Sequence, residues 1–356
     1  MSALDHVAEP AGDDSVMYTR CPALPNVSTL AHQLGLITAE FERDPSIAVV
    51  ERIGADVHVA GYRYWLRHAG YSKPLWAWTR GADTRLIAVS RHESACPVYA
   101  LPGSGIRAPA DLKGRRIGVV NDRKLALGYN RIIYLQTYIA ALARASLDLS
   151  DVEIVDFDID RAGLMRRTSA NYGDLAQSTM AAPAHENLFT EIAKDALVLL
   201  VRGEVDAIAA NVPPQVAKLL DLHTVYDSRT DPSIDARHDL RCLVVSGALV
   251  RERRDLLVRI VARLLEAGRW ALRSPEEAPR LLAEDLRVSE EVLRLDSDRI
   301  AGGMQILEPG EALAMLRAKS DLMAKYGFLD RHPELETWAD FSILVESRSL
   351  VGTRGQ

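Results

Sequence analysis

Short apolar runs alternate with helical patterns of apolar and polar residues over most of the chain. Four apolar runs predict β-strands, at residues 114–120, 152–157, 205–211 and 240–247. The patterns over 134–145 and 189–203 predict helices between them, and Gly203 is expected to end the second helix. Strands that alternate with helices in this way indicate an α/β protein with largely parallel sheets.

The pattern becomes almost wholly helical after Arg251. Six residues recur at helical spacing and predict one buried helix face: Leu256, Leu257, Ile260, Val261, Leu264 and Leu265. A second helix is predicted to begin at Pro275, with Ser274 as its N-cap and Glu277 completing a capping box. We expect the tail, residues 346–356, to be loosely held.

The length of 356 residues favours two domains. Because a βαβ block in the middle of the chain is flanked by helices that return after it, we expect a middle domain inserted into an outer one. The first lobe is predicted over 1–100 and 247–356, and the second over 101–246. A ligand site is expected in a cleft between the lobes, since ligands favour domain interfaces.

Composition limits the partners that this chain can have. With 48% hydrophobic and 26% charged residues, it has the composition of a globular protein. The net charge of −6 argues against nucleic acid or an anionic membrane surface as the main partner, so a small ligand is expected. Since the N-terminus has no apolar run that could serve as a signal peptide, we expect a cytoplasmic protein. We also expect a monomer or a dimer.

The three cysteines are widely spaced and odd in number, which is typical of free thiols in a reducing compartment. Cys96 and Cys242 are expected in the core. Cys21 follows a predicted strand, 16–20, and precedes a predicted helix, where a helix N-terminus lowers a thiol pKa and where α/β proteins bind ligands. Cys21 is therefore either a reactive thiol or a buried apolar residue.

Aromatic residues crowd into the segment 56–78. It contains three of the five tryptophans and three tyrosines: Tyr62, Tyr64, Trp65, Tyr71, Trp76 and Trp78. The segment also contains two histidines and two arginines: His58, Arg63, Arg67 and His68. Such a segment would suit a planar, anionic, aromatic ligand, because rings stack on rings and guanidinium groups bind the acid. The alternative is a helix whose apolar side packs in the core or in a dimer contact.

Standard catalytic and cofactor motifs are missing. The sequence contains no Walker loop, G-x-S-x-G elbow, H-E-x-x-H or C-x-x-C. Cys21, His58 and His68 do not match the spacing of a standard zinc site. These motifs therefore give no indication of a nucleotide site or a metal site.

Several stretches of the chain resemble the 2'-hydroxybiphenyl-2-sulfinate desulfinases. They are YTRCP (18–22), DVHVAGYRYWLRHAG (56–70), DLKGRRIGVV (111–120) and GRWALRSPEEA (268–278). The stretch HQLGLITAEFERDPSIAVV (32–50) is similar to the wider superfamily of sulfonate, nitrate and taurine solute-binding proteins. The resemblance implies a fold like that of type II periplasmic binding proteins, in which two α/β lobes with mixed sheets enclose a central cleft.

The resemblance also implies a set of site residues. Cys21 would be the nucleophile or the proton donor, His58 would lower its pKa or hold the thiolate, and Arg67 would bind the sulfinate oxygens. Thr19 or the backbone amide of Gly163 would stabilise charge that develops on the sulfinate. We expect four further side chains to contact the substrate: Tyr18, Tyr62, Trp65 and His68.

The function that the resemblance implies is cofactor-independent release of sulfite from an aromatic sulfinate. Two alternatives stay open. In the first, the chain would be a non-catalytic binding protein for a sulfonate or another small organic anion, and Cys21 would be inert. In the second, it would be a decarboxylase on the same fold.

Overall fold

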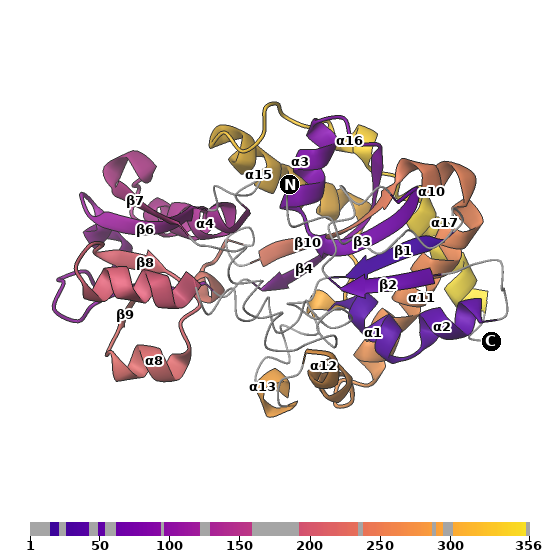
Figure 1. Cartoon of the computed structure of the whole chain (residues 1–356), viewed down its shortest axis with the longest axis horizontal. Coiled ribbons are helices and arrows are strands. Elements are labelled where there is room, and N and C mark those ends of the chain that lie inside the picture. Colours follow the sequence, from indigo (N-terminus) through magenta and orange to yellow (C-terminus); the bar gives the residue numbers. More distant parts are fainter. Residues whose placement is uncertain are drawn as a thin grey trace, which may run out of the picture. The chain divides into compact units, whose positions relative to one another are not determined.

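A computed structural model describes residues 15–20, 26–42, 49–53, 62–93, 96–121, 129–158, 192–233, 238–286, 290–294 and 302–353. The chain divides into two compact units, and each is described here by itself (Figure 1). Unit 1 comprises Met1–His92 and Leu240–Gln356, and unit 2 comprises Glu93–Asp239. Unit 2 is thus inserted between the two parts of unit 1.

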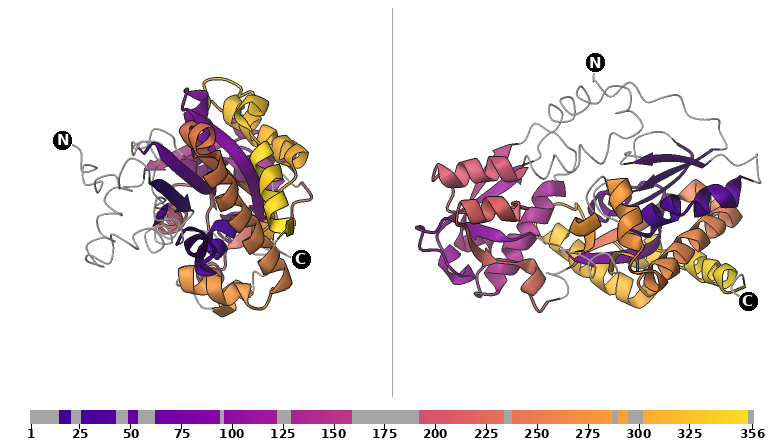
Figure 2. Two further views of the ribbon diagram at one scale, coloured as in Figure 1. Left: turned by 90° about the vertical axis from the view of Figure 1, so that its right-hand side faces the viewer. Right: turned by 90° about the horizontal axis from the view of Figure 1, so that it is seen from below.

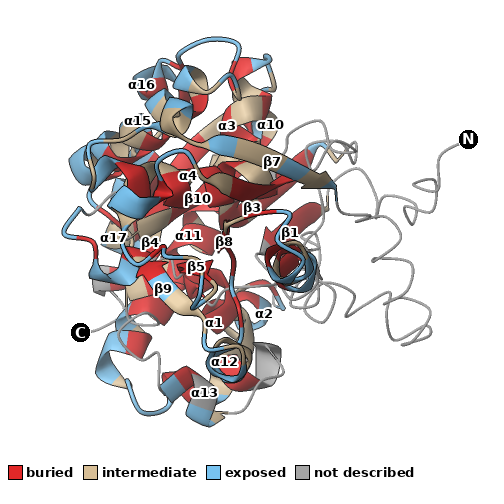
Figure 3. Ribbon diagram, turned by 90° about the vertical axis from the view of Figure 1, so that its left-hand side faces the viewer, coloured by how far each residue is buried: buried red, intermediate tan, exposed pale blue. Residues whose placement is uncertain are grey.

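Unit 1 contains a mixed five-stranded sheet in the order β2-β1-β3-β10-β4. The strands span Val49–Ile53, Val16–Arg20, Tyr64–Gly70, His238–Ser246 and Thr84–Glu93, in that order. β1 runs parallel to β2 and to β3, whereas β10 runs antiparallel to β3. Of the three inner strands, β3 and β10 are buried along most of their length (Figure 3). Both nevertheless carry polar residues, among them His68 in β3 and Arg241 in β10.

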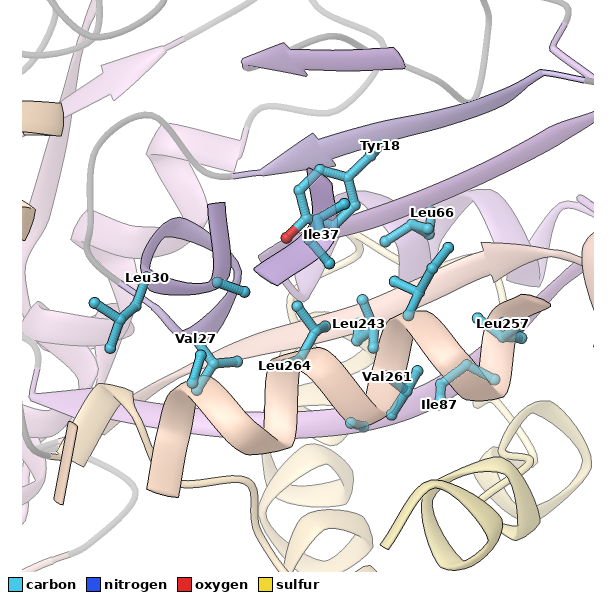
Figure 4. Packing of buried hydrophobic residues seen from close by; sticks show 14 of the residues in the cluster. Tyr18, Val27, Leu30, Ile37, Leu66, Ile87, Leu243, Leu257, Val261 and Leu264 are labelled. Carbon is cyan, nitrogen blue, oxygen red and sulfur yellow. The ribbon is translucent and has the colours of Figure 1, made fainter. Parts of the chain in front are cut away.

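A large hydrophobic core joins this sheet to several helices of unit 1 (Figure 4). These helices are α1 (Val27–Gln33), α2 (Leu36–Phe41), α10 (Gly247–Glu252), α11 (Arg254–Arg273), α12 (Ala278–Leu286), α13 (Glu290–Arg294) and α17 (Ser342–Thr353). Tyr18, Leu66 and Leu243 of the sheet meet Val261 and Leu264 of α11 in this core. The apolar face predicted for α11 is thus confirmed, except that Leu265 is only half-buried.

Two predictions for the C-terminal helices are wrong. The second helix spans Ala278–Leu286 and does not begin at Pro275, since 275–277 form a turn. The Ser274 carbonyl still accepts the Ala278 amide at 3.1 Å, as the carbonyl of an N-cap residue does. The tail is not loose up to Thr353, since α17 packs along α11 (Figure 2). The buried hydroxyl of Ser347 lies 2.7 Å from the carbonyl oxygen of Ile343 in its own helix and 3.0 Å from that of Val258 in α11, so its one proton is shared between the two helices.

The remaining helices of unit 1 are α3 (Ser72–Thr79), α15 (Pro309–Lys325) and α16 (Leu335–Trp338). The rings of Trp78 and Trp338 stack with centroids 5.6 Å apart. The buried indole N–H of Trp338 donates to Thr84 Oγ1 at 3.0 Å, so this aromatic pair is anchored to β4.

Unit 2 has its own mixed sheet in the order β7-β6-β8-β5-β9. The strands span Glu153–Asp158, Arg116–Asn121, Ala207–Ala209, Val98–Ala100 and His223–Tyr226, in that order. Its helices are α4 (Tyr129–Ala143), a helix at 192–201 and α8 (Pro214–Leu219), with 3₁₀ turns at Pro109–Leu112, Leu149–Asp151 and Ser228–Thr230. Gly203 has φ 69° just after the helix at 192–201, which confirms it as the stop.

The structure contains a strand at each of the four predicted runs and helices at both predicted patterns. The boundaries of the two units differ from those of the predicted lobes, which were placed after residues 100 and 246. β5 pairs with β8 and β9 of unit 2, so unit 2 begins at Glu93. Most of β10 pairs with β3 of unit 1, so unit 1 resumes at Leu240.

Candidate active site at the carboxyl ends of β1 and β3

The parallel strands β1 and β3 end at the same edge of the unit 1 sheet. Thr19 pairs with Arg67, and Arg20 pairs with His68. The carboxyl ends of parallel strands are where open α/β sheets bind ligands. Cys21 is the next residue after β1 in the sequence, but Cys21, His58 and Gly163 all lie outside the described residues. Their distance from Arg67 therefore stays a prediction.

The predicted site residues on these strands lie on two different faces of the sheet. Side chains alternate along a strand, so paired residues share a face. Thr19 and Arg67 are paired, and Trp65 shares their face because it is two residues from Arg67. Tyr18 and His68 lie on the opposite face, where both contact Ser28 of α1. The register thus separates residues that the sequence analysis grouped together.

Arg67 is half-buried in the middle of β3, and its side chain extends toward the carboxyl end of the strand. One of its guanidinium nitrogens donates to the carbonyl oxygen of Gly70, the last residue of the strand, at 3.2 Å. A guanidinium group carries its N–H donors in a planar fork that matches the two oxygens of an acidic group. Arg67 is thus the described residue best suited to bind an acidic group at this edge of the sheet.

His68 is buried, with 1% of its surface exposed, and both of its ring nitrogens lie near serine hydroxyls. Nδ1 is 2.7 Å from Ser28 Oγ of α1, and Nε2 is 3.4 Å from Ser90 Oγ of β4. Burial lowers the pKa of His68 to about 3, and the positive charges of Arg241 and Arg67 act in the same direction. The imidazole is therefore neutral near pH 7 and contacts the two serines.

Tyr18 and Thr19 are both buried in β1. The ring of Tyr18 lies in the hydrophobic core, and its hydroxyl donates to the carbonyl oxygen of Ser28 at 3.1 Å (Figure 4). Tyr18 thus fastens β1 to the first turn of α1, a contact that the sequence analysis did not anticipate.

Most aromatic residues of the segment 56–78 pack within unit 1. Residues 64–70 form a strand, so the alternative of a helix is wrong for that part, whereas Ser72–Thr79 is a helix. Trp65 is buried and its backbone N–H donates to Ser246 Oγ at 3.3 Å. The guanidinium of Arg80 lies over the Trp76 ring, 4.8 Å from its centroid. Tyr62 is half-buried just before β3. Packing therefore accounts for much of the aromatic density.

The other two cysteines are core residues, as expected. Cys96 and Cys242 are both buried. Burial raises the pKa of the Cys96 thiol to about 12, so this thiol carries no charge near pH 7. Cys242 lies in β10 with no exposed surface.

The sequence analysis missed the polar group around His68. Ser28 and Ser90 contact the imidazole, and the buried guanidinium of Arg241 lies 3.1 Å from Nε2 of His92. Nothing in the local sequence could reveal these contacts, because they join residues from four elements far apart in the chain. The asparagine-serine pattern at 26–28 indicates only a helix start, and Asn26 is the N-cap of α1.

The described residues contain neither a candidate metal site nor a membrane-spanning helix. They include no group of three or more His, Cys, Asp or Glu side chains that could hold a metal ion. None of the described helices combines the length and apolar character that crossing a membrane requires.

Comparisons with solved structures define the class of this fold. The aliphatic sulfonate-binding protein SsuA of Escherichia coli is 16% identical and covers 91% of each chain with a TM-score of 0.57. The desulfurization enzyme DszB is 23% identical, with a TM-score of 0.69 over 95% of this chain and 99% of the enzyme. A cysteine-to-serine variant of DszB, solved with biphenyl-2-sulfinic acid, gives the same TM-score. The chain has the α/β fold of the type II periplasmic binding proteins, as the sequence analysis expected.

Sequence comparison points to one kind of protein within this class. The 2'-hydroxybiphenyl-2-sulfinate desulfinase of Rhodococcus erythropolis is 26% identical over 362 residues, which cover 92% of this chain and 91% of the desulfinase. No family model matches the chain. The resemblance to the desulfinases is thus confirmed over nearly the whole length.

Proposed function

We propose that this protein is a desulfinase-like enzyme that cleaves the C–S bond of an aromatic sulfinate and releases sulfite. The observation that carries the proposal is the similarity to 2'-hydroxybiphenyl-2-sulfinate desulfinase over 92% of the chain. The position of Arg67 supports it, because a guanidinium at the carboxyl end of β3 can bind both oxygens of a sulfinate. No cofactor or metal is part of the proposed reaction.

Cys21 is proposed as the reacting group, since it directly follows β1 in the sequence and β1 pairs with the strand that carries Arg67. In one route the Cys21 thiolate attacks the sulfinate sulfur, the C–S bond breaks, and the ring carbon takes a proton from solvent. The hydrocarbon departs, and an SO₂⁻ group stays bound to the cysteine sulfur. Water then splits this adduct into thiol and bisulfite. In the other route the thiol protonates the ring carbon, and the SO₂ that leaves is hydrated to bisulfite while the thiolate regains a proton.

The other predicted residues have proposed roles around these two. His58 would lower the thiol pKa or hold the thiolate, and the hydroxyl of Thr19 or the amide of Gly163 would stabilise charge on the sulfinate. Thr19 supports this assignment, because it is paired with Arg67 on the same face of the sheet. Trp65, on that face, is proposed to contact the aryl group of the substrate. Tyr62 precedes the amino end of β3, away from the end that the Arg67 guanidinium reaches, and is not assigned this role. A cytoplasmic location is part of the proposal.

The alternative is a non-catalytic binding protein for a sulfonate or a similar organic anion. The fold shared with SsuA favours it, since that protein binds aliphatic sulfonates and covers 91% of this chain. In this case Arg67 would bind the anion and Cys21 would be inert. A decarboxylase on the same fold is the remaining candidate from the sequence, and no feature of the described residues favours it.

The test is incubation with 2-phenylbenzenesulfinate, with sulfite and biphenyl both quantified. The desulfinase proposal expects the two products in equal amounts, and expects Cys21→Ser to remove turnover while binding, measured by calorimetry, is nearly unchanged. Cys96→Ala is the control, because it removes a buried thiol of unit 2, outside the sheet that carries Arg67, and should keep most of the turnover. Tight binding without either product, from a range of aryl sulfinates, would reject the enzyme and support the binding protein.

A further inference from the structure

His68 connects three separate elements of unit 1 through its ring. It is part of β3, its Nδ1 lies 2.7 Å from Ser28 Oγ of α1, and its Nε2 lies 3.4 Å from Ser90 Oγ of β4. A neutral imidazole has one donor and one acceptor nitrogen, and a hydroxyl can serve as either partner. Both nitrogens of the buried ring can thus be satisfied by the two serines.

Ser28 is held on three sides at the start of α1. Its amide donates to Asn26 Oδ1 at 2.9 Å, its carbonyl accepts from the Tyr18 hydroxyl at 3.1 Å, and its own hydroxyl meets His68. All of these groups are buried. Buried hydrogen bonds are costly to break, because each group would be left without a partner. The first turn of α1 is therefore fixed to both β1 and β3.

These contacts fix the two ends of the connection between β1 and α1. β1 ends at Arg20 and Asn26 caps α1, so five residues of the sequence, 21–25, join the two elements. The contacts of Tyr18 and Ser28 set where this connection starts and where it stops. Cys21 is the first residue of this connection.

We infer that His68 is a positioning residue, which holds α1 against β3 through Ser28 and so sets the position of Cys21 relative to Arg67. This inference rests on the proposed function, since it concerns the proposed reacting thiol. His68 itself does not touch the substrate in this role. Its neighbour in sequence, Arg67, binds the anion, and the same stretch of β3 thus supplies both the anion-binding group and the support for the thiol.

Ser28→Ala and Ser90→Ala form a matched pair of variants for the test. Each removes one buried hydroxyl that meets His68, but only Ser28 belongs to the helix that follows Cys21. We expect Ser28→Ala to lower kcat for sulfite release about tenfold or more, with KM changed less than about threefold, because a displaced thiol affects the chemical step more than binding. Ser90→Ala should keep kcat within about twofold of the parent.

A second readout needs no substrate. The pH midpoint for alkylation of Cys21 by iodoacetamide, followed by mass spectrometry, should rise toward the ordinary thiol value of about 8.5 in Ser28→Ala and stay unchanged in Ser90→Ala. His68→Leu should behave like Ser28→Ala. His68→Asn should restore part of the effect, because its side-chain amide can replace Nδ1 toward Ser28.

The outcomes separate this inference from the proposed function. If the parent releases sulfite and Ser28→Ala matches Ser90→Ala in kcat and in alkylation midpoint, the positioning role of His68 is rejected and the desulfinase proposal stands. If the parent releases no sulfite and its Cys21 titrates near about 8.5, the proposed function is rejected and the inference is rejected with it.

Discussion

Thr19 on β1 and Arg67 on β3 are paired in the parallel register of the unit 1 sheet, so their side chains lie on the same face. Thr19 is buried and Arg67 is half-buried, with one guanidinium nitrogen bonded to the carbonyl of Gly70. A hydroxyl and a guanidinium are thus neighbours at the edge of the sheet where α/β proteins bind ligands. This pair is the described part of the proposed anion site.

Arg67→Lys should weaken the binding of an aryl sulfinate or sulfonate by about 10- to 100-fold. A lysine keeps the charge but cannot bind two oxygens in the fixed geometry of a guanidinium group, and charge-assisted hydrogen bonds contribute about 1.5–3 kcal/mol. Calorimetric titration with 2-phenylbenzenesulfinate measures the change. Arg63→Lys is the control, because Arg63 is exposed and pairs with Glu252 at 2.7 Å at the other end of β3. Equal effects of the two substitutions would contradict an anion site at Arg67.

Cys21 should react with iodoacetamide at least about tenfold faster than Cys96 and Cys242 in the folded protein. Both reference thiols are buried, and burial raises the pKa of Cys96 to about 12, which leaves almost no thiolate to react near pH 7. Peptide mapping after short labelling times gives the three rates. Labelling in denaturant should make them similar, since the differences come from the fold. Similar rates in the folded protein would argue against an activated thiol.

The stability of the protein should depend on His68 between about pH 6.5 and 3. The pKa of His68 is lowered to about 3 in the folded protein by burial and by Arg241 and Arg67, so the unfolded chain binds a proton here that the folded chain does not. Stability is therefore lost as pH falls from about 6.5, by about 1.4 kcal/mol per unit from this one group. The loss would end near pH 3.

The measurement for His68 is urea unfolding of the parent and of His68→Asn at pH 7, 6 and 5. The variant should be less stable at pH 7, because it loses packing and the contact with Ser90. The gap between the two proteins should narrow as the pH falls, since only the parent pays for keeping a buried imidazole neutral. Parallel stability curves would show that another group causes the pH dependence.

Local pattern was sufficient to predict most elements of the fold. The apolar runs at 114–120 and 240–247 correspond to β6 and β10, and the helical spacing after Arg251 corresponds to α11. The pattern did not identify β3 as a strand. Tyr64–Gly70 is a strand with nearly continuous burial, and such a run has no period that distinguishes it from a buried helix.

The candidate site was less predictable because it depends on register. The sequence grouped Tyr18 and His68 with Arg67, but strand pairing puts them on the opposite face, in contact with Ser28. A single-residue change of register would reverse these faces, and nothing in the sequence fixes the pairing of β1 with β3. The prediction of a loose tail at 346–356 was wrong for a related reason. Ser347 Oγ contacts a carbonyl of α11, and the residues next to Ser347 in the sequence do not indicate this partner.

Gly268 permits the close approach of α11 to two other segments of unit 1. A Cβ at this position would lie 2.8 Å from the carbonyl oxygen of Met304 and 3.3 Å from Cγ1 of Val27. The first contact is with backbone, which cannot move aside like the end of a flexible side chain. Gly268→Ala must therefore displace α11 or the segment around Met304.

We expect Gly268→Ala to destabilise the protein by about 1–3 kcal/mol, the usual cost of forcing extra atoms into a packed interior. The matched control is Gly310→Ala, in the first turn of α15, where a Cβ would meet nothing within 4 Å. An alanine there should be neutral or stabilise the helix by up to about 1 kcal/mol. Urea unfolding of both variants gives the comparison, and a Gly268→Ala protein as stable as the control would mean that α11 does not pack this closely against Met304. Because Val27 begins the helix that follows Cys21, Gly268→Ala should also slow sulfite release more than Gly310→Ala does.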